Sequence, residues 1–200
     1  MEGTRRLEAF SDGVFAIIIT IMVLELRPPH GTDIAALRPL LPVILSYALS
    51  FVYVGIYWNN HHHMLRMTHR VTGGIMWANL HLLFWLSLIP FVTAWIGENN
   101  FAPVPLSLYG VVLLLDAIAY LILQRTIVAS QGRHSPFAAA IGRDLKGWLS
   151  PLLYIVAIAG AFVYRWIAGA MYVAVALTWL IPDRRIERAL ERQGKQNVEV

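Results

Sequence analysis

Charged and polar side chains stand immediately before the first strongly apolar run of the chain. Arg6, Ser11 and Asp12 precede residues 14–24, in which Thr20 is the single polar residue. A charge at the mouth of such a helix is unfavourable without a partner, so these residues are candidates for a functional or structural role. The separation of Arg6 and Asp12 favours a buried ion-pair network. Ser11 has a second explanation, because serine is also a common N-cap of the helix that follows it.

Three consecutive histidines, His61, His62 and His63, raise the question of a metal site. Adjacent positions on a helix point about 100° apart, so the three imidazoles cannot all ligate one ion from a regular helix. The spacing of Trp58, His61 and His62 instead places the indole and one imidazole on a common face. A membrane metalloenzyme that uses the His61–His63 cluster is therefore the less favoured alternative. With no cysteine in the chain, thiolate metal sites and disulfides are excluded.

Asp116 is a lone carboxylate in the middle of a long apolar segment. It is either a relay for protons or cations, or it pairs with a donor on a neighbouring helix, and the sequence leaves both explanations open. A proton-coupled cation transporter that uses Asp116 and a histidine is thus an alternative function. Asn79 lies in another apolar segment, where we expect its amide to bridge two helices.

The elements that must position these residues are membrane-spanning helices. The chain is 58% apolar and 14% charged, whereas soluble domains carry about 25% charged residues. We therefore predict an all-α integral membrane protein of six transmembrane helices, each long enough to cross a bilayer. Their expected bounds are 9–26, 37–58, 74–95, 105–123, 145–164 and 166–181. Residues 1–182 form the transmembrane domain, and 183–200 form a charged cytoplasmic tail.

The distribution of basic residues predicts the orientation of these helices. With both termini in the cytoplasm, most of the 16 Lys and Arg residues fall on the cytoplasmic side. Those left on the other side are Arg27, Arg38 and Arg165. Because topology explains the positive charge, we expect no nucleic-acid partner.

The first helix carries an apolar stripe. At about 100° per residue, Ile17, Ile21 and Leu24 fall on one face, with Thr20 at its edge and Ser11 and Asp12 elsewhere. Periodicity alone indicates a face that contacts lipid or a neighbouring helix.

Four spaced motifs resemble the transmembrane protein 175 family of potassium channels. They are Arg6-x-x-x-Phe10-Ser11-Asp12, Trp58-x-x-His61-His62, Trp77-x-Asn79-Leu80 and Ile89-Pro90-Phe91-x-Thr93. The resemblance is strong over the first half of the chain and rests on helix count beyond it.

The resemblance implies an ion channel in the bacterial inner membrane, without enzymatic activity or a cofactor. The first helix would line a central pore in a homotetramer, with Ile17, Ile21 and Leu24 as the constriction and Thr20 as a polar layer. Asp12 would neutralise Arg6, and His61 or His62 would share its carboxylate. The full structural network implied in this way is Arg6, Ser11, Asp12, Trp58, His61 and His62. Potassium and other monovalent cations would permeate, with a modest preference for K⁺ over Na⁺, because an apolar ring has few dipoles with which to distinguish them.

Overall fold

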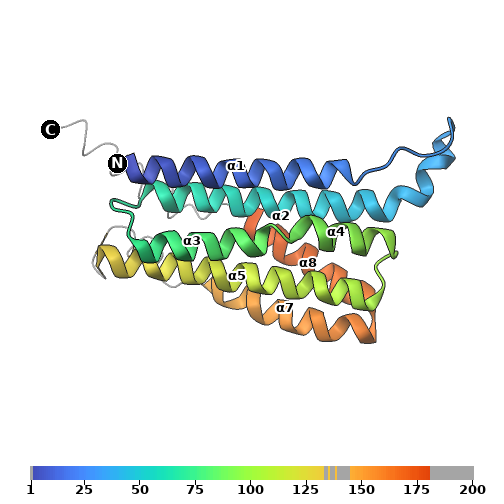
Figure 1. Ribbon diagram of the computed structural model, residues 1–200. Coiled ribbons are helices and arrows are strands. Elements are labelled where there is room, and N and C mark those ends of the chain that lie inside the picture. The colour runs from blue at the N-terminus through green and yellow to red at the C-terminus, as the bar shows by residue number, and fades with distance from the viewer. Residues whose placement is uncertain (1, 133–134, 136–137, 139–144, 181–200) are drawn as a thin grey trace.

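The architecture comes from a computed structural model, which describes residues 2–132, 135, 138 and 145–180. The described part of the chain is entirely helical apart from turns and connections, and its helices run side by side (Figure 1). The elements are α1 (Glu2–Leu24), the 3₁₀ helix η1 (Ile34–Leu40), α2 (Leu41–Arg66), α3 (Gly73–Leu86), α4 (Ile89–Glu98), α5 (Pro103–Gln131), α7 (Leu145–Val163) and α8 (Arg165–Leu180). The predicted tail at 183–200 lies outside the described residues.

The number of membrane-spanning segments follows from the lengths of these helices. Five segments are long and apolar enough to cross a bilayer: 2–24, 34–66, 73–98, 103–131 and 146–163. The sixth predicted segment is α8, an apolar helix of 16 residues, which spans about 24 Å at 1.5 Å per residue. The prediction of an all-α integral membrane protein is confirmed.

The third spanning segment is broken near Pro90. Pro90 has no N–H group to donate to the carbonyl of Leu86, four residues earlier, and its ring crowds that carbonyl. As a result, α3 ends at Leu86, and α4 begins at Ile89 with Pro90 in its first turn. The break lies a little before the proline, and α3 and α4 continue end to end (Figure 1).

Two helix ends differ from the prediction in a way that changes the environment of the polar residues. α1 begins at Glu2 rather than near residue 9, so Ser11 and Asp12 lie inside the helix instead of capping it. α2 continues to Arg66 rather than ending at Trp58, which places the three histidines within the helix. Both extensions are polar turns of a helix whose remaining length is apolar. Composition alone therefore placed the start of α1 too late and the end of α2 too early.

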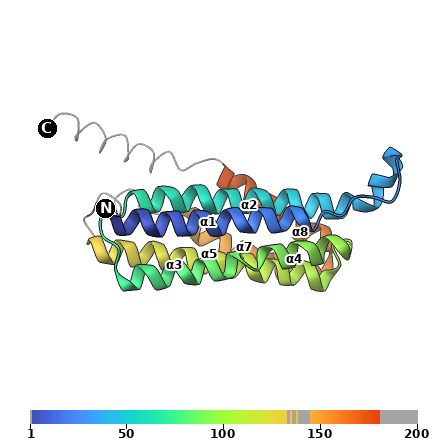
Figure 2. The same ribbon diagram turned by 45° about the horizontal axis from the view of Figure 1, so that its top comes forward.

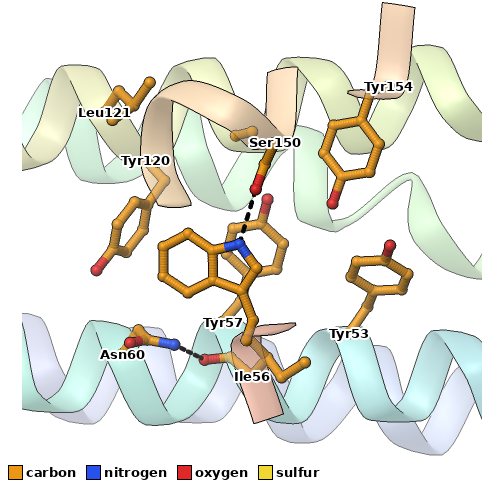
Figure 3. Close-up of a pocket in the computed structure, with 11 residues that line it drawn as sticks. Tyr53, Ile56, Tyr57, Asn60, Tyr120, Leu121, Ser150 and Tyr154 are labelled. Atoms are coloured by element: carbon orange, nitrogen blue, oxygen red, sulfur yellow. Dashed lines mark hydrogen bonds between the residues drawn. The ribbon is translucent and has the colours of Figure 1, made fainter. Parts of the chain in front are cut away.

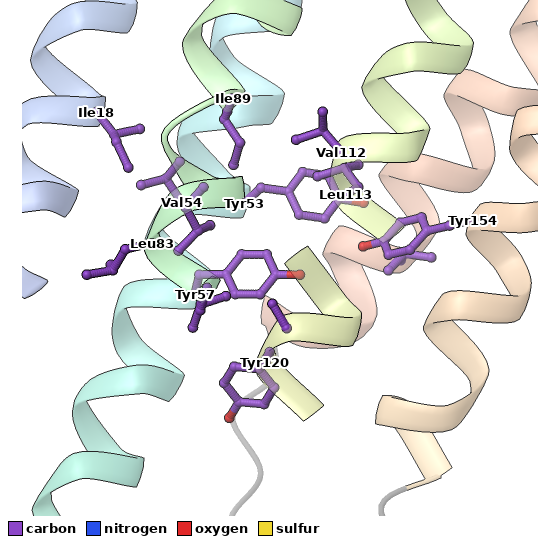
Figure 4. Packing of buried hydrophobic residues seen from close by; sticks show 14 of the residues in the cluster. Ile18, Tyr53, Val54, Tyr57, Leu83, Ile89, Val112, Leu113, Tyr120 and Tyr154 are labelled. Carbon is purple, nitrogen blue, oxygen red and sulfur yellow. The ribbon is translucent and has the colours of Figure 1, made fainter. Parts of the chain in front are cut away.

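The helices pack so that α1 lies at an edge of the bundle. α1 packs mainly against α2, with further contacts to α3 and α4, while α5 packs against α3, α4, α7 and α8. In Figure 1, α1 and α7 occupy opposite edges, and the turned view in Figure 2 keeps α1 on the outside. The buried core includes Val54, Leu83, Ile89 and Leu113 of α2, α3, α4 and α5, and side chains of α1, α7 and α8 also contribute to it (Figure 4). One face of α1 is consequently left uncovered by the other described helices.

Gly97 allows the close approach of α4 to α2. A Cβ atom at this position would lie 2.8 Å from the Cα atom of Val43 and 2.7 Å from the Oγ atom of Ser46. Because a backbone atom is one of the two obstacles, a side-chain rotation cannot remove the clash.

We predict that Gly97→Ala lowers the stability of the folded protein by about 1–3 kcal/mol, since the two helices must separate to admit a methyl group. The measurement is thermal unfolding of the purified protein in detergent. Gly55→Ala on α2 is the matched control, because a Cβ atom there has no neighbour within 4 Å. Equal melting temperatures for the two variants would contradict the assigned role of Gly97.

Candidate functional site

The two faces of α1 have different surroundings. Its buried face consists of Ser11, Phe15, Ile18 and Met22, spaced three or four residues apart so that they point into the bundle. The stripe predicted from the helical wheel is exposed on the other side: Ile17 is 57% exposed, Ile21 43% and Leu24 78%. Thr20 is also exposed, and its hydroxyl donates to the carbonyl of Ile17 over 2.9 Å. The candidate site is thus an apolar surface with one hydroxyl, on a helix that the rest of the described chain covers on one side.

The opposite face of α1 is tied to α2 and α3 by a buried hydrogen-bond chain. The Nε2 atom of His61 lies 2.6 Å from Oδ1 of Asn79, and Nδ2 of Asn79 donates to the Ser11 hydroxyl over 3.0 Å. The Ser11 hydroxyl donates to the carbonyl of Leu7 over 2.8 Å. All three side chains are buried. This geometry shows that Ser11 is not an N-cap, because its hydroxyl bonds backward within a helix that has already begun.

The direction of every hydrogen bond in this chain is determined. The Ser11 hydroxyl has a single proton, which goes to Leu7, so its oxygen must accept from Asn79. The amide oxygen of Asn79 then faces His61 and requires the imidazole to carry its proton on Nε2. Asn79 therefore bridges α1 and α2 from α3, as the sequence predicts for a polar side chain in an apolar helix.

A second set of polar contacts joins α1 to α2 at two successive turns. The indole N–H of Trp58 donates to Oδ1 of Asp12 over 3.0 Å, and Nδ1 of His62 lies 2.8 Å from Oε1 of Glu8. Glu8 and Asp12 are four residues apart, as are Trp58 and His62, whose rings stack with centroids 6.0 Å apart. Sequence reasoning missed Glu8, although its spacing from Asp12 places both carboxylates on one face of a helix that starts early enough to include them.

The structure does not bring Arg6 and Asp12 together within a subunit. Arg6 is exposed and makes no ion pair with Asp12. Six residues of helix correspond to about 240° of net rotation, so the two side chains leave α1 on different sides. The expectation of a buried Arg6–Asp12 pair within the chain is therefore wrong. Neither of the two candidate histidines shares the Asp12 carboxylate, because His61 contacts Asn79 and His62 contacts Glu8.

The remaining candidates can be placed as well. Within the described residues, no group of three His, Asp or Glu side chains is arranged to hold a metal ion. Asp116 is fully buried on α5, and neither of its carboxylate oxygens has a hydrogen-bond partner among the described residues. Of the two explanations that the sequence leaves open for Asp116, the donor on a neighbouring helix is therefore not found among the described residues.

We predict that Asn79→Ala destabilises the protein, because it leaves the imidazole N–H of His61 buried without its acceptor and Ser11 without its donor. An unsatisfied buried polar group costs about 1–3 kcal/mol. Thermal unfolding in detergent measures the effect. Asn99→Ala is the matched control, since Asn99 is exposed and, among the described residues, its side chain bonds only the carbonyl of Trp95. If both substitutions lowered the melting temperature equally, the bridge would not be a main support of α1.

Comparisons of the sequence with known proteins all point to one family. Residues 6–90 match the family described as endosomal/lysosomal potassium channel TMEM175. A potassium channel of Chryseobacterium sp. (strain P1-3) is 54% identical over 186 residues, which are 93% of this chain and 97% of that protein. A potassium channel of Chamaesiphon minutus is 31% identical over 190 residues, covering 87% of this chain and 92% of that one.

A solved structure extends the match to the whole fold. The crystal structure of a lysosomal potassium-selective channel TMEM175 homolog from Chamaesiphon minutus superposes with a TM-score of 0.81 at 30% sequence identity. The superposition covers 92% of this chain and 99% of that one. Three findings point to the same family: the match over residues 6–90, the similarity to a bacterial relative over nearly its full length, and the shared helix arrangement. The chain therefore belongs to the TMEM175 family.

Proposed function

We propose that the protein is a potassium-permeable cation channel that works as a homotetramer in the bacterial inner membrane. The names of its relatives support an ion channel rather than an enzyme, since both bacterial relatives are called potassium channels. In this proposal residues 1–182 form the channel domain and residues 183–200 form a cytoplasmic tail. The excess of basic residues in the segments on one side supports cytoplasmic termini.

The observation that carries the proposal is the uncovered apolar stripe on α1. A single α1 cannot enclose a pore, whereas cyclic symmetry around this face would place identical stripes from all subunits on one axis. Ile17, Ile21 and Leu24 then form successive apolar rings, and the Thr20 hydroxyls form a polar layer between them. The edge position of α1 supports this arrangement, because none of the other described helices lies over the stripe.

The residues in the proposed constriction account for the expected ion preference. Apolar rings can close a pore by excluding water, but they offer few dipoles to replace an ion's hydration shell. The hydroxyl proton of Thr20 is already donated to Ile17, so only its oxygen lone pairs remain for a passing cation. We therefore propose passage of K⁺ and other monovalent cations with a modest preference for K⁺.

The polar contacts of α1 support a structural role for Ser11, Asp12, Trp58, His61 and His62. Bonds from His61 through Asn79 to Ser11, and from Trp58 to Asp12, hold the face opposite the stripe. Arg6 is exposed in one subunit, which leaves its guanidinium accessible to a neighbouring subunit in a tetramer. We propose that Arg6 joins the network across that boundary.

The two alternative functions, a metalloenzyme and a proton-coupled transporter, require different arrangements of the polar side chains. A metalloenzyme would need the imidazoles to converge, whereas His61 bonds Asn79 and His62 bonds Glu8. A proton-coupled transporter would use Asp116 and would require a pH gradient to drive cation movement. This dependence of cation movement on a pH gradient distinguishes the transporter from a channel in an experiment.

The deciding experiment measures K⁺ flux into liposomes that contain the purified protein, with Na⁺ flux as the comparison. We expect passive K⁺ flux down its gradient at equal pH on both sides, and a smaller Na⁺ flux. Cation movement only in the presence of a pH gradient would replace the channel by the transporter. A complete absence of cation flux in both conditions would reject both.

A substitution in the proposed constriction tests whether Ile17 forms part of the gate. Ile17→Asn should raise K⁺ flux several-fold, because a polar amide wets an apolar ring that otherwise excludes water. Ile155→Asn is the matched control: Ile155 is 54% exposed, similar to Ile17, but belongs to α7, which occupies the opposite edge of the bundle (Figure 1). An equal effect of the two substitutions, or no effect of either, would place the gate elsewhere.

A further inference from the structure

An arginine and a tryptophan form an exposed pair on the side of the bundle away from α1. The guanidinium carbon of Arg125 on α5 lies over the indole ring of Trp148 on α7, 5.1 Å from the ring centroid. Both side chains are exposed, Trp148 to 67%. Because α7 occupies the edge opposite α1 (Figure 1), an assembly centred on the α1 stripe leaves this pair in contact with the surrounding lipid.

The Arg125 guanidinium keeps its hydrogen-bond donors available. Among the described residues, Arg125 makes no ion pair, and its one polar contact is with the ring. A cation over an aromatic face is held by the charge distribution of the ring rather than by hydrogen bonds, so the N–H groups remain free for another acceptor. Their planar, forked arrangement matches two oxygens of a phosphate group.

The indole of Trp148 has an unused donor as well. Trp179 on α8, at the same end of the bundle, donates its indole N–H to the Ser150 hydroxyl over 2.8 Å. No such acceptor faces the N–H group of Trp148 among the described residues. A tryptophan with one wet and one apolar side is typical of the boundary between lipid tails and headgroups.

An exposed apolar surface leads from the pair into the bilayer. The side chains on the same helix faces are apolar and between 38% and 57% exposed: Ile118 and Ile122 on α5, and Leu152 and Ile155 on α7. The two helices are antiparallel, since Ser107 near the start of α5 donates to the carbonyl of Ile158 near the end of α7. Both faces therefore extend in the same direction from the pair. Seven residues of helix rise about 10 Å, roughly two-thirds of one leaflet of a hydrocarbon core about 30 Å thick.

The bundle behind this surface does not admit an acyl chain. An interior cavity lies between α2, α5, α7 and α8, with Tyr53, Tyr57, Tyr120 and Tyr154 among its walls (Figure 3). Its volume is about 30 Å³, whereas a cavity that binds benzene measures about 150 Å³. A lipid tail at this place therefore lies along the outer faces of α5 and α7.

The end of the bundle that carries the pair is basic. Gln131 at the end of α5 donates to the carbonyl of Met67 just after α2 over 3.0 Å, which places the ends of these helices together. Basic residues outnumber acidic ones at this end among the described residues. The basic ones are Arg5, Arg6, Arg66, Arg70, Arg125 and Lys146, and the acidic ones are Glu2, Glu8 and Asp12. The proposed orientation puts this end in the cytoplasm, on the side of the leaflet that carries anionic lipid.

We propose that Arg125 and Trp148 form a binding site for an anionic phospholipid on the outer face of α5 and α7. The lipid phosphate accepts hydrogen bonds from the Arg125 guanidinium, and the Trp148 indole N–H donates to another oxygen of the lipid. One acyl chain lies along the apolar faces of the two helices. A zwitterionic lipid has the same phosphate, but its positively charged group is repelled by the guanidinium, and it binds less tightly. The site requires no ion conduction and goes beyond the proposed channel function.

The test is native mass spectrometry of the full chain, purified in detergent and freed of lipid. Phosphatidylglycerol and phosphatidylcholine of equal chain length are supplied together. We expect wild-type protein to bind phosphatidylglycerol preferentially, and Arg125→Gln to lower the affinity for this lipid by about five-fold. Affinity for phosphatidylcholine should not change. Trp148→Leu, which keeps an apolar side chain but removes the ring and its N–H group, should lower the affinity for phosphatidylglycerol as well.

Arg165 provides the matched control. It is also an exposed arginine over a tryptophan ring, 5.3 Å from the centroid of Trp166, but its guanidinium donates to the carbonyl of Asn100 over 3.2 Å. It lies at the other end of α7, where α8 begins. Arg165→Gln should leave the preference for phosphatidylglycerol unchanged, and Arg125→Lys, which keeps the charge, should retain part of it.

Several results would overturn the proposal. They are equal binding of the two lipids to the wild-type protein, wild-type affinity for phosphatidylglycerol in Arg125→Gln, or an equal loss in Arg165→Gln. Displacement of phosphatidylglycerol by an equal concentration of inorganic phosphate would assign the pair to free anions instead of lipid. None of these measurements depends on ion flux. A protein without K⁺ flux that still preferred phosphatidylglycerol would refute the channel and leave the lipid site intact.

Discussion

The hydrogen-bond chain from His61 through Asn79 to Ser11 fixes the rotation of α1, and the candidate site depends on that rotation. In a bilayer, a polar side chain turned toward lipid loses its partners and gains none. Rotating α1 by one residue, about 100°, would remove Ser11 from Asn79 and Asp12 from Trp58 together. The same rotation would replace the exposed apolar stripe with a different set of side chains. The polar contacts on one side of the helix therefore determine which residues lie on the other.

Two kinds of interaction fix the orientation of α1 in the bundle. Lipid is as apolar as the stripe, so the hydrophobic effect gives α1 little preference for one orientation in the membrane. Directional hydrogen bonds supply the preference, and close packing supports it, as where Gly97 brings α4 against α2. The contacts of Glu8 with His62 and of Asp12 with Trp58 act at successive turns, which constrains tilt as well as rotation.

The general architecture could be predicted from the sequence because long apolar segments have few alternatives to membrane helices. The stripe of Ile17, Ile21 and Leu24 could be predicted because helical periodicity does not depend on where the helix begins. The ends of the helices were harder to predict. Both α1 and α2 extend into polar sequence, and their polar turns are stabilised by contacts with each other that composition does not reveal. The wrong pairing of Arg6 with Asp12 has the same cause. An irregular segment before the helix could bring the two side chains together, whereas a regular helix holds these two positions on different sides.

The placement of Asp116 illustrates what only the packed structure could decide. The sequence allowed either a donor on a neighbouring helix or a relay, and the described surroundings contain tyrosine hydroxyls but no cation. Such hydroxyls can both donate and accept a proton, whereas a lysine or arginine would hold the carboxylate permanently charged. A bundle that needed only stability could fill this position with an apolar residue and avoid the penalty of a buried carboxyl group. The surroundings of Asp116 and the uncovered face of α1 thus differ in kind: tyrosine side chains lie around a buried carboxyl group inside the bundle, whereas the uncovered face carries apolar side chains and one hydroxyl.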